Sequence, residues 1–308
     1  MQIFNTHKDI PGYAQGAVIA IGNFDGVHLG HKALLGAAKE KARALGKKTG
    51  VLTFEPHPRS LFRPDDPAFR ITPAAVKADR LKEAGADYVF AVPFDWDFAS
   101  QSAELFVENV LKKGLNPAHV VVGYDFCFGQ LRKGSPQTIK DGGLDVTVLE
   151  KVTADDDKEA ISSSNIRSAL RHGDIETANS LLGWEWEIRG QVVHGDRRGR
   201  ELGFPTANVK LEGTLHPAYG VYATWVQIEG EDEWRASATN IGIRPMFEVH
   251  EGLVEAHIFD FNREIYGKTL RIKPVRRLRG EAKFASIDDL IAQMGRDCAQ
   301  VREILQNS

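Results

Sequence analysis

The sequence predicts an α/β domain followed by an antiparallel β-barrel. Up to Gly183, short apolar runs alternate with helical patterns, which is typical of a parallel sheet covered on both faces. After Gly183, several short strand-like runs follow one another before a last helical pattern, which favours a barrel or a sandwich. We therefore expect a Rossmann-like α/β domain over residues 1–183 and an antiparallel β-barrel with a C-terminal helix over residues 184–308.

The bulk properties narrow the class of protein. A length of 308 residues suits two ordinary domains, and a net charge of -3 gives no general attraction to nucleic acid or anionic membranes. The two cysteines, Cys127 and Cys298, are far apart, which fits a reducing cytoplasm better than a disulfide scaffold. No signal peptide and no membrane-spanning run is visible. We expect a cytoplasmic protein with small-molecule partners, with neither nucleic acid nor membrane as a partner, and with transient self-association left open.

The strands of the first domain are expected where apolar residues run without interruption. Such runs suit strands that are buried on both faces. In parallel sheets, ligands bind at the carboxyl ends of the strands, where the strand order reverses. The expected strands are 17–24, 49–54, 87–94, 119–126 and 144–150.

Helix signals fall between these strands. Thr72 and Ser102 are suitable N-caps, and Gly85 and Gly114 are expected to end the same two helices. Another helical pattern follows the first strand. Two short helices close the domain, over 164–173 and 174–183.

The second half changes to a period of two. Trp184, Trp186 and Ile188 alternate with charged residues, which predicts a half-buried strand with its charges facing outward. Further strands are expected over 220–228, 234–242, 252–261 and 269–278. A final helix should start after Ser286 as N-cap. Its apolar stripe should pack on the barrel and place Cys298 in the core; the stripe is Ile287, Leu290, Ile291, Met294, Cys298, Val301 and Leu305.

The motif GNFDGVHLGH lies where the first strand gives way to a helix. Backbone N–H groups at a helix N-terminus are unpaired and favour anions, and Gly22 and Gly26 would let a phosphate approach the backbone. His28 and His31, three residues apart, project to the same side of the helix. Two imidazoles there can stabilise charge on a phosphate under attack, as nucleotidyl transfer requires.

Two other interpretations of the histidines are weaker. They could be surface residues at a helix start, but their position directly after a buried strand argues against chance. They could also bind a metal ion, but no further ligand stands nearby at a suitable spacing.

A second motif, ISSSNIR, also points to phosphate. One of Ser162, Ser163 and Ser164 should cap the helix that follows. Arg167 in the first turn opposes the helix dipole, and an anionic ligand would compensate for that placement.

Together these motifs carry a family resemblance. Four motifs of the first half resemble the adenylyltransferase domain of bacterial bifunctional riboflavin kinase/FAD synthetases. They are GNFDGVHLGH, FEPHP (54–58), VVGYDFCFG (121–129) and ISSSNIR. In the second half, motifs resemble the kinase domain of the same family, in the same order: RGRELGFPTANV (198–209), NIGIRPMF (240–247), VEAHIFDF (254–261) and RLRGEAKF (277–284).

The resemblance implies two reactions. Riboflavin and ATP would give FMN in the second domain, and FMN and ATP would give FAD and pyrophosphate in the first. It implies that Thr206 and Asn208 bind Mg²⁺ and that Glu255 is the general base. Taken alone, the PTAN tetrapeptide would be a weak signal, since Thr and Asn are common turn residues.

For the first domain, the resemblance implies a catalytic set and a binding set. His28, His31 and Arg167 would be catalytic, and Asp125 would bind flavin. The ATP phosphates would contact the glycine-rich loop and the serines, namely Gly22, Phe24, Gly30, Ser162, Ser163 and Ser164.

Two residues depart from the family pattern. Cys127 stands where a basic residue is common, and Met246 stands where threonine is common; both bear on flavin binding rather than catalysis. Arg197, Arg198 and Arg200 either hold phosphates or form a solvated basic loop.

Two rival functions remain. One is a nucleotidyltransferase for another phosphate ester, and the other is a flavin sensor or carrier that keeps both folds without turnover. The PTAN motif and Glu255 argue against the first rival. Intact His28, His31, Arg167 and Glu255 argue against the second, since a mere binder needs none of them.

Overall fold

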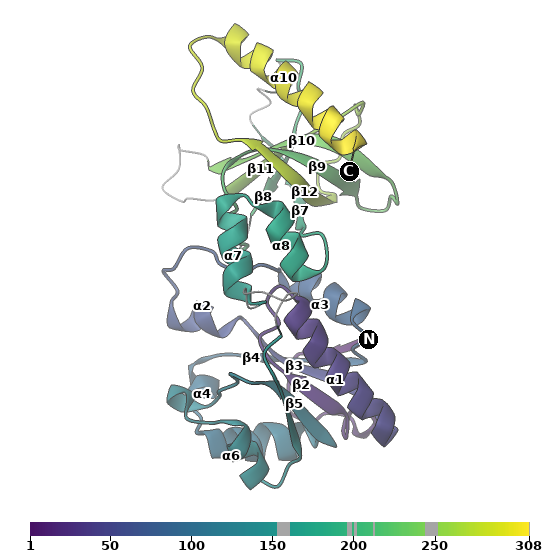
Figure 1. Ribbon diagram of the computed structural model, residues 1–308, viewed down its shortest axis with the longest axis vertical. Coiled ribbons are helices and arrows are strands. Elements are labelled where there is room, and N and C mark those ends of the chain that lie inside the picture. Colours follow the sequence, from purple (N-terminus) through teal and green to yellow (C-terminus); the bar gives the residue numbers. More distant parts are fainter. Residues whose placement is uncertain (153–160, 196–198, 200–201, 212, 244–251, 308) are drawn as a thin grey trace. The chain divides into compact units, whose positions relative to one another are not determined.

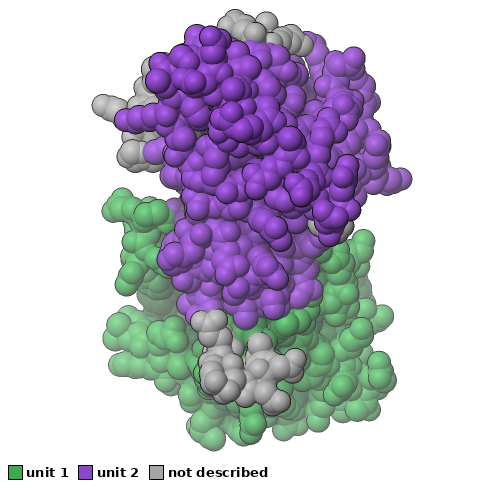
Figure 2. Space-filling view, turned by 45° about the horizontal axis from the view of Figure 1, so that its top comes forward, with its two compact units in different colours: residues 1–67, 74–162 green, residues 68–73, 163–308 purple. Residues whose placement is uncertain are grey.

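The computed structural model describes residues 1–152, 161–195, 199, 202–211, 213–243 and 252–307 (Figure 1). The chain forms two compact units (Figure 2). Unit 1 comprises residues 1–67 and 74–162, and unit 2 comprises residues 68–73 and 163–308.

Unit 1 is built on a parallel sheet of six strands in the order β1-β4-β3-β2-β5-β6. The strands are β1 (Gln2–Phe4), β2 (Val18–Ile21), β3 (Thr49–Glu55), β4 (Tyr88–Pro93), β5 (His119–Gly123) and β6 (Val146–Leu149). Five of them confirm the predicted strands. The sixth, β1, was not predicted, because it is a three-residue edge strand in which only one residue is even partly buried.

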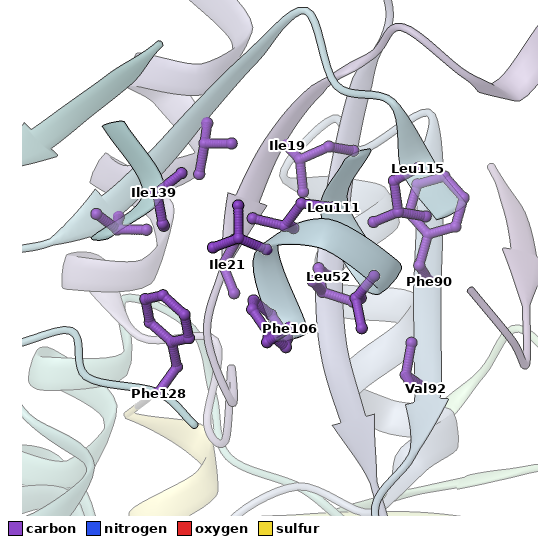
Figure 3. Close-up of a cluster of buried hydrophobic side chains, with 14 of the residues drawn as sticks. Ile19, Ile21, Leu52, Phe90, Val92, Phe106, Leu111, Leu115, Phe128 and Ile139 are labelled. Atoms are coloured by element: carbon purple, nitrogen blue, oxygen red, sulfur yellow. The ribbon is translucent and has the colours of Figure 1, made fainter. Parts of the chain in front are cut away.

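Helices cover both faces of this sheet. On one face Val18 and Ala20 pack with residues of α1 (Leu29–Leu45) and α3 (Ala74–Glu83). On the other face Ile19 and Ile21 pack with η2 (Phe106–Leu115), a π-helical segment, and with α6 (Pro136–Asp141) (Figure 3). Each large apolar side chain buried in this way contributes about 1.5–3 kcal/mol relative to exposure. The shorter helices of unit 1 are η1 (Gly12–Ala14), α2 (Pro58–Phe62), α4 (Trp96–Ala99), α5 (Ala103–Leu105) and η3 (Gln130–Arg132).

One predicted helix end in unit 1 is wrong. Ser102 caps α5 as expected, since its hydroxyl accepts from the Leu105 N–H at 3.2 Å. Gly114, however, lies inside η2, and the left-handed residue that ends the segment is Asn116, with φ of 44°. Gly114 is needed for another reason: a Cβ there would lie 2.4 Å from the carbonyl oxygen of His7.

The strand order reverses beside β2. From β2 the chain continues to β3 and β4 on one side, and later returns to β5 and β6 on the other. In open α/β sheets a ligand crevice forms at the carboxyl ends of the strands at such a point. The sheet therefore places the segment after β2 where a ligand is expected.

Unit 2 is centred on a closed barrel of six antiparallel strands in the order β10-β11-β8-β7-β12-β9, as predicted. The strands are β7 (Ile188–Val193), β8 (Ala207–Lys210), β9 (Gly220–Ile228), β10 (Trp234–Ile243), β11 (Gly252–Ile258) and β12 (Thr269–Arg279). The helices are α7 (Ser163–His172), α8 (Ile175–Leu182) and α10 (Ile287–Gln306). Both short helices before the barrel and the Ser286 N-cap of α10 match the predictions.

One charged residue before β7 departs from the expected alternation of buried apolar and exposed charged side chains. Glu187 was expected to face outward, but its side chain is fully buried and forms ion pairs with Arg189 and Arg271. Burial alone would raise the pKa of this carboxyl, and the hydrogen bonds from Arg271 and Arg189 outweigh that effect and lower it. The charge is tolerated inside because two guanidinium groups satisfy it.

The apolar stripe of α10 serves two purposes. Val301 and Leu305 are buried against the barrel, together with Ala223 and Phe259. Cys298 was expected in the core but is only half-buried, because it borders a cavity. Leu290 and Met294 line the same cavity, and Ile287, at the start of the helix, is exposed.

Residues 68–73, which we call the strap, come from the first half of the chain and are hydrogen-bonded to unit 2. The indole Nε1 of Trp186 donates to the carbonyl of Ile71 at 2.9 Å, and the Leu215 N–H donates to the carbonyl of Arg70 at 2.8 Å. Helix α8 packs on β12. The compact unit that holds the barrel thus includes α7 and α8, while the boundary expected between residues 183 and 184 stays a prediction.

We expect these helices to stabilise the barrel. A fragment of residues 163–308 should unfold at a temperature at least about 3 °C above that of a fragment of residues 185–308, since loss of about 1 kcal/mol shifts the midpoint by about 2–8 °C in domains of about 60–250 residues. Thermal unfolding followed by circular dichroism measures the difference. Equal midpoints would contradict a structural role for α7 and α8.

Candidate active site

The segment between β2 and α1 has a strained backbone. Phe24 and Val27 have φ of 52° and 39°, and Gly26 has φ of 91°. Left-handed conformations of non-glycine residues cost on the order of 1–3 kcal/mol each and persist where surrounding contacts impose them. The ring of Phe24 is fully buried in the core and supplies one such contact. We refer to Gly22–His28 as the strained loop.

His28 and His31 lie together at the end of this loop. Nδ1 of His28 accepts from the backbone N–H of His31 at 3.3 Å, so that His28 is the N-cap of α1. The two rings stack with centroids 3.7 Å apart and an interplanar angle of 18°. Because Nδ1 of His28 is an acceptor, its neutral ring carries the proton on Nε2, where it can donate to an anion.

Gly30 leaves space for the imidazole of His28. A Cβ at this position would lie 3.1 Å from two atoms of the His28 ring, which is tighter than an ordinary contact. The structure thus brings together five residues singled out in the sequence, all of them in unit 1. They are Gly22, Phe24, His28, Gly30 and His31.

Asp125 follows β5, the strand beside β2, at the same carboxyl edge of the sheet. Its side chain is exposed, as is that of Cys127 two residues on. The rings of Phe126 and Phe128 stack with centroids 5.4 Å apart and pack in or against the core of unit 1. An acidic side chain therefore stands in solvent close in sequence to an aromatic pair.

The second phosphate motif is divided between the two units. Ser162 belongs to unit 1, while Ser163, Ser164 and Arg167 belong to α7 of unit 2. Nε of Arg167 donates to the carbonyl of Phe69 at 2.8 Å, and its guanidinium lies 5.5 Å from the Phe69 ring centroid. Within unit 2 the strap therefore orients Arg167.

Unit 2 contains two neighbouring cavities that share a wall. The larger, of ≈ 450 Å³, is bordered by apolar side chains from the barrel and from α10, and Glu255 and Glu281 also face it. The smaller, of ≈ 230 Å³, is bordered by Arg263, Tyr266 and other residues. Thr206 and Asn208 border both cavities.

A row of polar side chains begins at this wall and crosses three strands along the larger cavity. Glu255 on β11 stands opposite Asn208 on β8 and opposite Asn240 on β10. Nδ2 of Asn240 donates to Oε2 of Glu255 at 3.4 Å. Because cross-strand partners present their side chains on the same face, the barrel register itself brings the three groups together.

The wall also suits a hard cation. Oδ1 of Asn208 is buried and has no hydrogen-bond partner in the part of the chain that the structure describes. Gly195 leaves room beside the wall, since a Cβ there would lie 2.4 Å from Asn208 Nδ2. Amide and hydroxyl oxygens are ligands that Mg²⁺ accepts together with water and substrate phosphates.

Two features of this site were missed in the sequence. Asn240 lies in the NIGIRP motif, but only the strand register reveals that it faces Glu255. Asp297 of α10 is buried and forms a bidentate pair with Arg279 of β12, which ties the helix to the edge of the larger cavity. Burial and the Asp297 carboxylate raise the pKa of the neighbouring Cys298, so this residue lines the cavity as a neutral thiol.

Four other residues singled out in the sequence lie outside the described residues. They are Arg197, Arg198, Arg200 and Met246.

The two units define a class of protein. Unit 1 has a nucleotidyltransferase-like α/β fold in which two histidines stand at a helix start, and unit 2 is a closed antiparallel barrel with a C-terminal helix and a row of polar side chains. None of the helices in the described part of the chain is both long and apolar enough to cross a membrane.

Comparison with known proteins identifies the family. The FAD synthetase family model matches residues 10–165, and the riboflavin kinase model matches residues 182–305. The bifunctional riboflavin kinase/FMN adenylyltransferase of Bacillus subtilis is 40% identical over 305 residues, which cover 96% of this chain and 95% of that protein. The protein of the same name from Escherichia coli is 39% identical over 291 residues and covers 94% and 93%. The chain belongs to the bifunctional riboflavin kinase/FMN adenylyltransferase family.

A solved structure has the same architecture over its full length. It comes from Streptococcus pneumoniae, has a TM-score of 0.85 at 34% sequence identity, and covers 97% of this chain and 98% of its own. That structure is described as a macrolide-efflux protein. The family assignment rests instead on the two domain matches and the curated relatives.

The N-cap role of His28 gives a test that does not depend on catalysis. His28→Ala removes the cap acceptor, whereas His28→Asn removes the ring but keeps an oxygen that can accept from the His31 N–H. We expect the alanine variant to be less stable than the asparagine variant by about 1 kcal/mol. Hydrogen exchange at the His31 amide measures the difference directly. Equal protection in the two variants would contradict the cap.

Proposed function

We propose that each unit supplies the main groups for one of the two reactions. Unit 2 phosphorylates riboflavin with ATP to give FMN and ADP, and the strained loop with its two histidines transfers AMP from ATP to FMN. The observation that carries the proposal is the row of Asn208, Glu255 and Asn240 along the larger cavity, which reaches the smaller cavity at Asn208.

The larger cavity is the better fit for riboflavin. Its apolar lining suits the isoalloxazine ring, and Glu255, which faces this cavity, must reach the acceptor hydroxyl. The smaller cavity, with Arg263 and Tyr266, then takes ATP. Thr206 and Asn208 stand where the two substrates would meet.

In the kinase step, the carboxylate of Glu255 takes the proton of the riboflavin 5′-hydroxyl. The hydroxyl oxygen forms a bond to the γ-phosphorus, the bond from that phosphorus to the β–γ bridging oxygen breaks, and ADP leaves. Asn240 donates to Glu255 and restricts its orientation. The apolar side chains of α10 exclude water from the acceptor, which limits hydrolysis of ATP.

Thr206 and Asn208 are the residues that would hold Mg²⁺. When bound, this ion would neutralise charge on the ATP phosphates. The buried Oδ1 of Asn208 supports this assignment.

In the adenylyl step, a phosphate oxygen of FMN attacks the α-phosphorus of ATP and pyrophosphate leaves. His28 offers an Nε2–H donor beside the stacked ring of His31, at the N-terminus of α1. The two histidines stabilise charge on the reacting phosphate. The backbone at Gly22, Phe24 and Gly30 contributes to the same site. We assign Ser162, Ser163, Ser164 and Arg167 to the ATP phosphates and Asp125 to the flavin.

The setting of these reactions is also a proposal. We infer a cytoplasmic enzyme, supported by the two free cysteines, Cys127 and Cys298. Its partners are small molecules, and transient self-association is compatible with them. A sensor without turnover would need neither Glu255 nor the two histidines.

Incubation of the full chain with riboflavin, ATP and Mg²⁺ tests the proposal. Chromatography of the flavins over time should show FMN, then FAD. Bound but unchanged riboflavin would favour the sensor, and FMN without FAD would restrict the activity to unit 2.

Replacement of the proposed base should affect only the kinase. Glu255→Gln keeps size and polarity, so we expect kinase kcat to fall by about 10²–10⁴ while FAD formation from supplied FMN persists. Glu281→Gln is the matched variant, because Glu281 is a second carboxylate in the same cavity and has no place in the polar row. If kinase kcat fell in Glu281→Gln and not in Glu255→Gln, Glu281 would be the base instead.

A methyl group beside Asn208 should weaken the proposed metal site. Gly195→Ala places a Cβ 2.4 Å from Asn208 Nδ2, so the amide must move. Kinase kcat should fall by about 10- to 100-fold, and the Mg²⁺ concentration for half-maximal rate should rise. Gly295→Ala in α10 is the control, since its Cβ would have no described atom within 4 Å apart from its chain neighbours and its own helix backbone. An unchanged Mg²⁺ requirement in Gly195→Ala would count against Asn208 as a ligand.

A further inference from the structure

Lys77 is a buried charge that neither reaction uses. It lies near the middle of α3 in unit 1 and is 4% exposed. No other lysine or arginine in the part of the chain that the structure describes is buried. A buried ammonium is costly unless its contacts compensate for lost hydration, so its contacts indicate what it does.

Within the described part of unit 1, three oxygen atoms lie close to the ammonium of Lys77. Its Nζ lies 2.5 Å from Oε1 of Glu55, 3.4 Å from Oγ1 of Thr53 and 3.5 Å from the carbonyl oxygen of Asn23. Thr53 is fully buried, and its hydroxyl donates to the same Asn23 carbonyl at 3.0 Å. Two donors, one from β3 and one from α3, therefore converge on one backbone oxygen.

That oxygen belongs to the strained loop. Asn23 directly precedes Phe24, the first of the left-handed residues. Because a peptide group is planar, a fixed Asn23 carbonyl also fixes the N–H of Phe24, from which the turn toward His28 begins. A backbone of this kind persists only where its surroundings impose it.

The ion pair with Glu55 is poorly explained by stability alone. Buried pairs are often no more stabilising than apolar side chains of the same volume, whereas removal of one partner is strongly destabilising. Glu55 is itself 23% exposed, so this pair is only partly shielded. Its position beneath the loop carbonyl is the feature that a purely apolar replacement would lose.

We propose that Lys77 is a positioning residue for adenylyl transfer. It rests on the proposed function of unit 1. Glu55 holds the ammonium, the ammonium and Thr53 hold the Asn23 carbonyl, and the carbonyl holds the strained loop in the conformation that presents His28 and the α1 N-terminus to the reacting phosphate. Lys77 itself need not touch the substrate.

The test removes the pair without leaving a lone buried charge. In the full chain, the double variant Glu55→Gln/Lys77→Met replaces both charges by groups of similar size. We expect kcat for FAD formation from FMN and ATP to fall about 10²-fold, as for a small misplacement of reacting groups, with little change in KM for FMN. Riboflavin phosphorylation by the same molecules should be unchanged, which reports that the preparation is active.

A second variant separates the loop from the charge. Thr53→Val removes the hydroxyl, which donates to the Asn23 carbonyl and accepts from Lys77 Nζ, but it keeps both charges of the ion pair, so kcat for FAD formation should again fall with KM unchanged. Lys48→Met is the matched control. Lys48 forms a solvent-exposed ion pair with Asp87 in the same unit, at 3.3 Å. Its loss should leave both activities at the wild-type level.

Each outcome decides the proposal. A folded double variant with kcat for FAD formation at the wild-type level would overturn it. If the double variant does not fold, Thr53→Val decides alone, since wild-type kcat there would overturn the proposal and a reduced kcat would support it. A wild-type chain that makes FMN but no FAD would refute the proposed function of unit 1, and the inference with it.

Discussion

The strained backbone between β2 and α1 is the constraint on which unit 1 depends. Phosphate binding needs unpaired N–H groups at a helix start, and the left-handed residues of this loop turn the chain into that helix within a few positions. The surrounding fold pays for the strain: Phe24 is buried in the core, and β3 and α3 supply the donors to Asn23. The strand order reverses beside this loop, and at such a point an open α/β sheet is expected to bind its ligand.

In unit 2, the strand register determines which polar side chains lie next to one another. In a closed barrel a shift of one residue would turn every side chain to the opposite face, so the pairing of β8, β11 and β10 fixes Asn208, Glu255 and Asn240 as neighbours. Glycines then remove side chains where the polar wall needs space, as at Gly195. Helix α10 completes the larger cavity with one part of its apolar stripe and holds to the barrel with the other.

The periodic features could be predicted from the sequence, and the three-dimensional juxtapositions could not. Runs such as 119–126 predicted buried strands because both faces of the sheet are covered, and the histidine motif predicted an anion site because a strand and a helix flank it. Asn240 escaped notice because its partner is 15 positions away and strand register is not readable from one sequence. Glu187 was misplaced because alternation cannot reveal that Arg189 and Arg271 neutralise it inside. Gly114 was misread as a helix end because its true constraint, the His7 carbonyl, is distant in sequence.

The central claim is that one chain carries two chemically separate sites. It is tested most directly by mixing two full-length variants, His31→Ala and Glu255→Gln, and supplying riboflavin, ATP and Mg²⁺. The first variant should make FMN but little FAD, and the second should make almost no FMN. The account predicts that the mixture forms FAD, because FMN released by one chain is adenylylated by the other. A mixture in which FMN accumulates without FAD, although the second variant converts supplied FMN when alone, would contradict it.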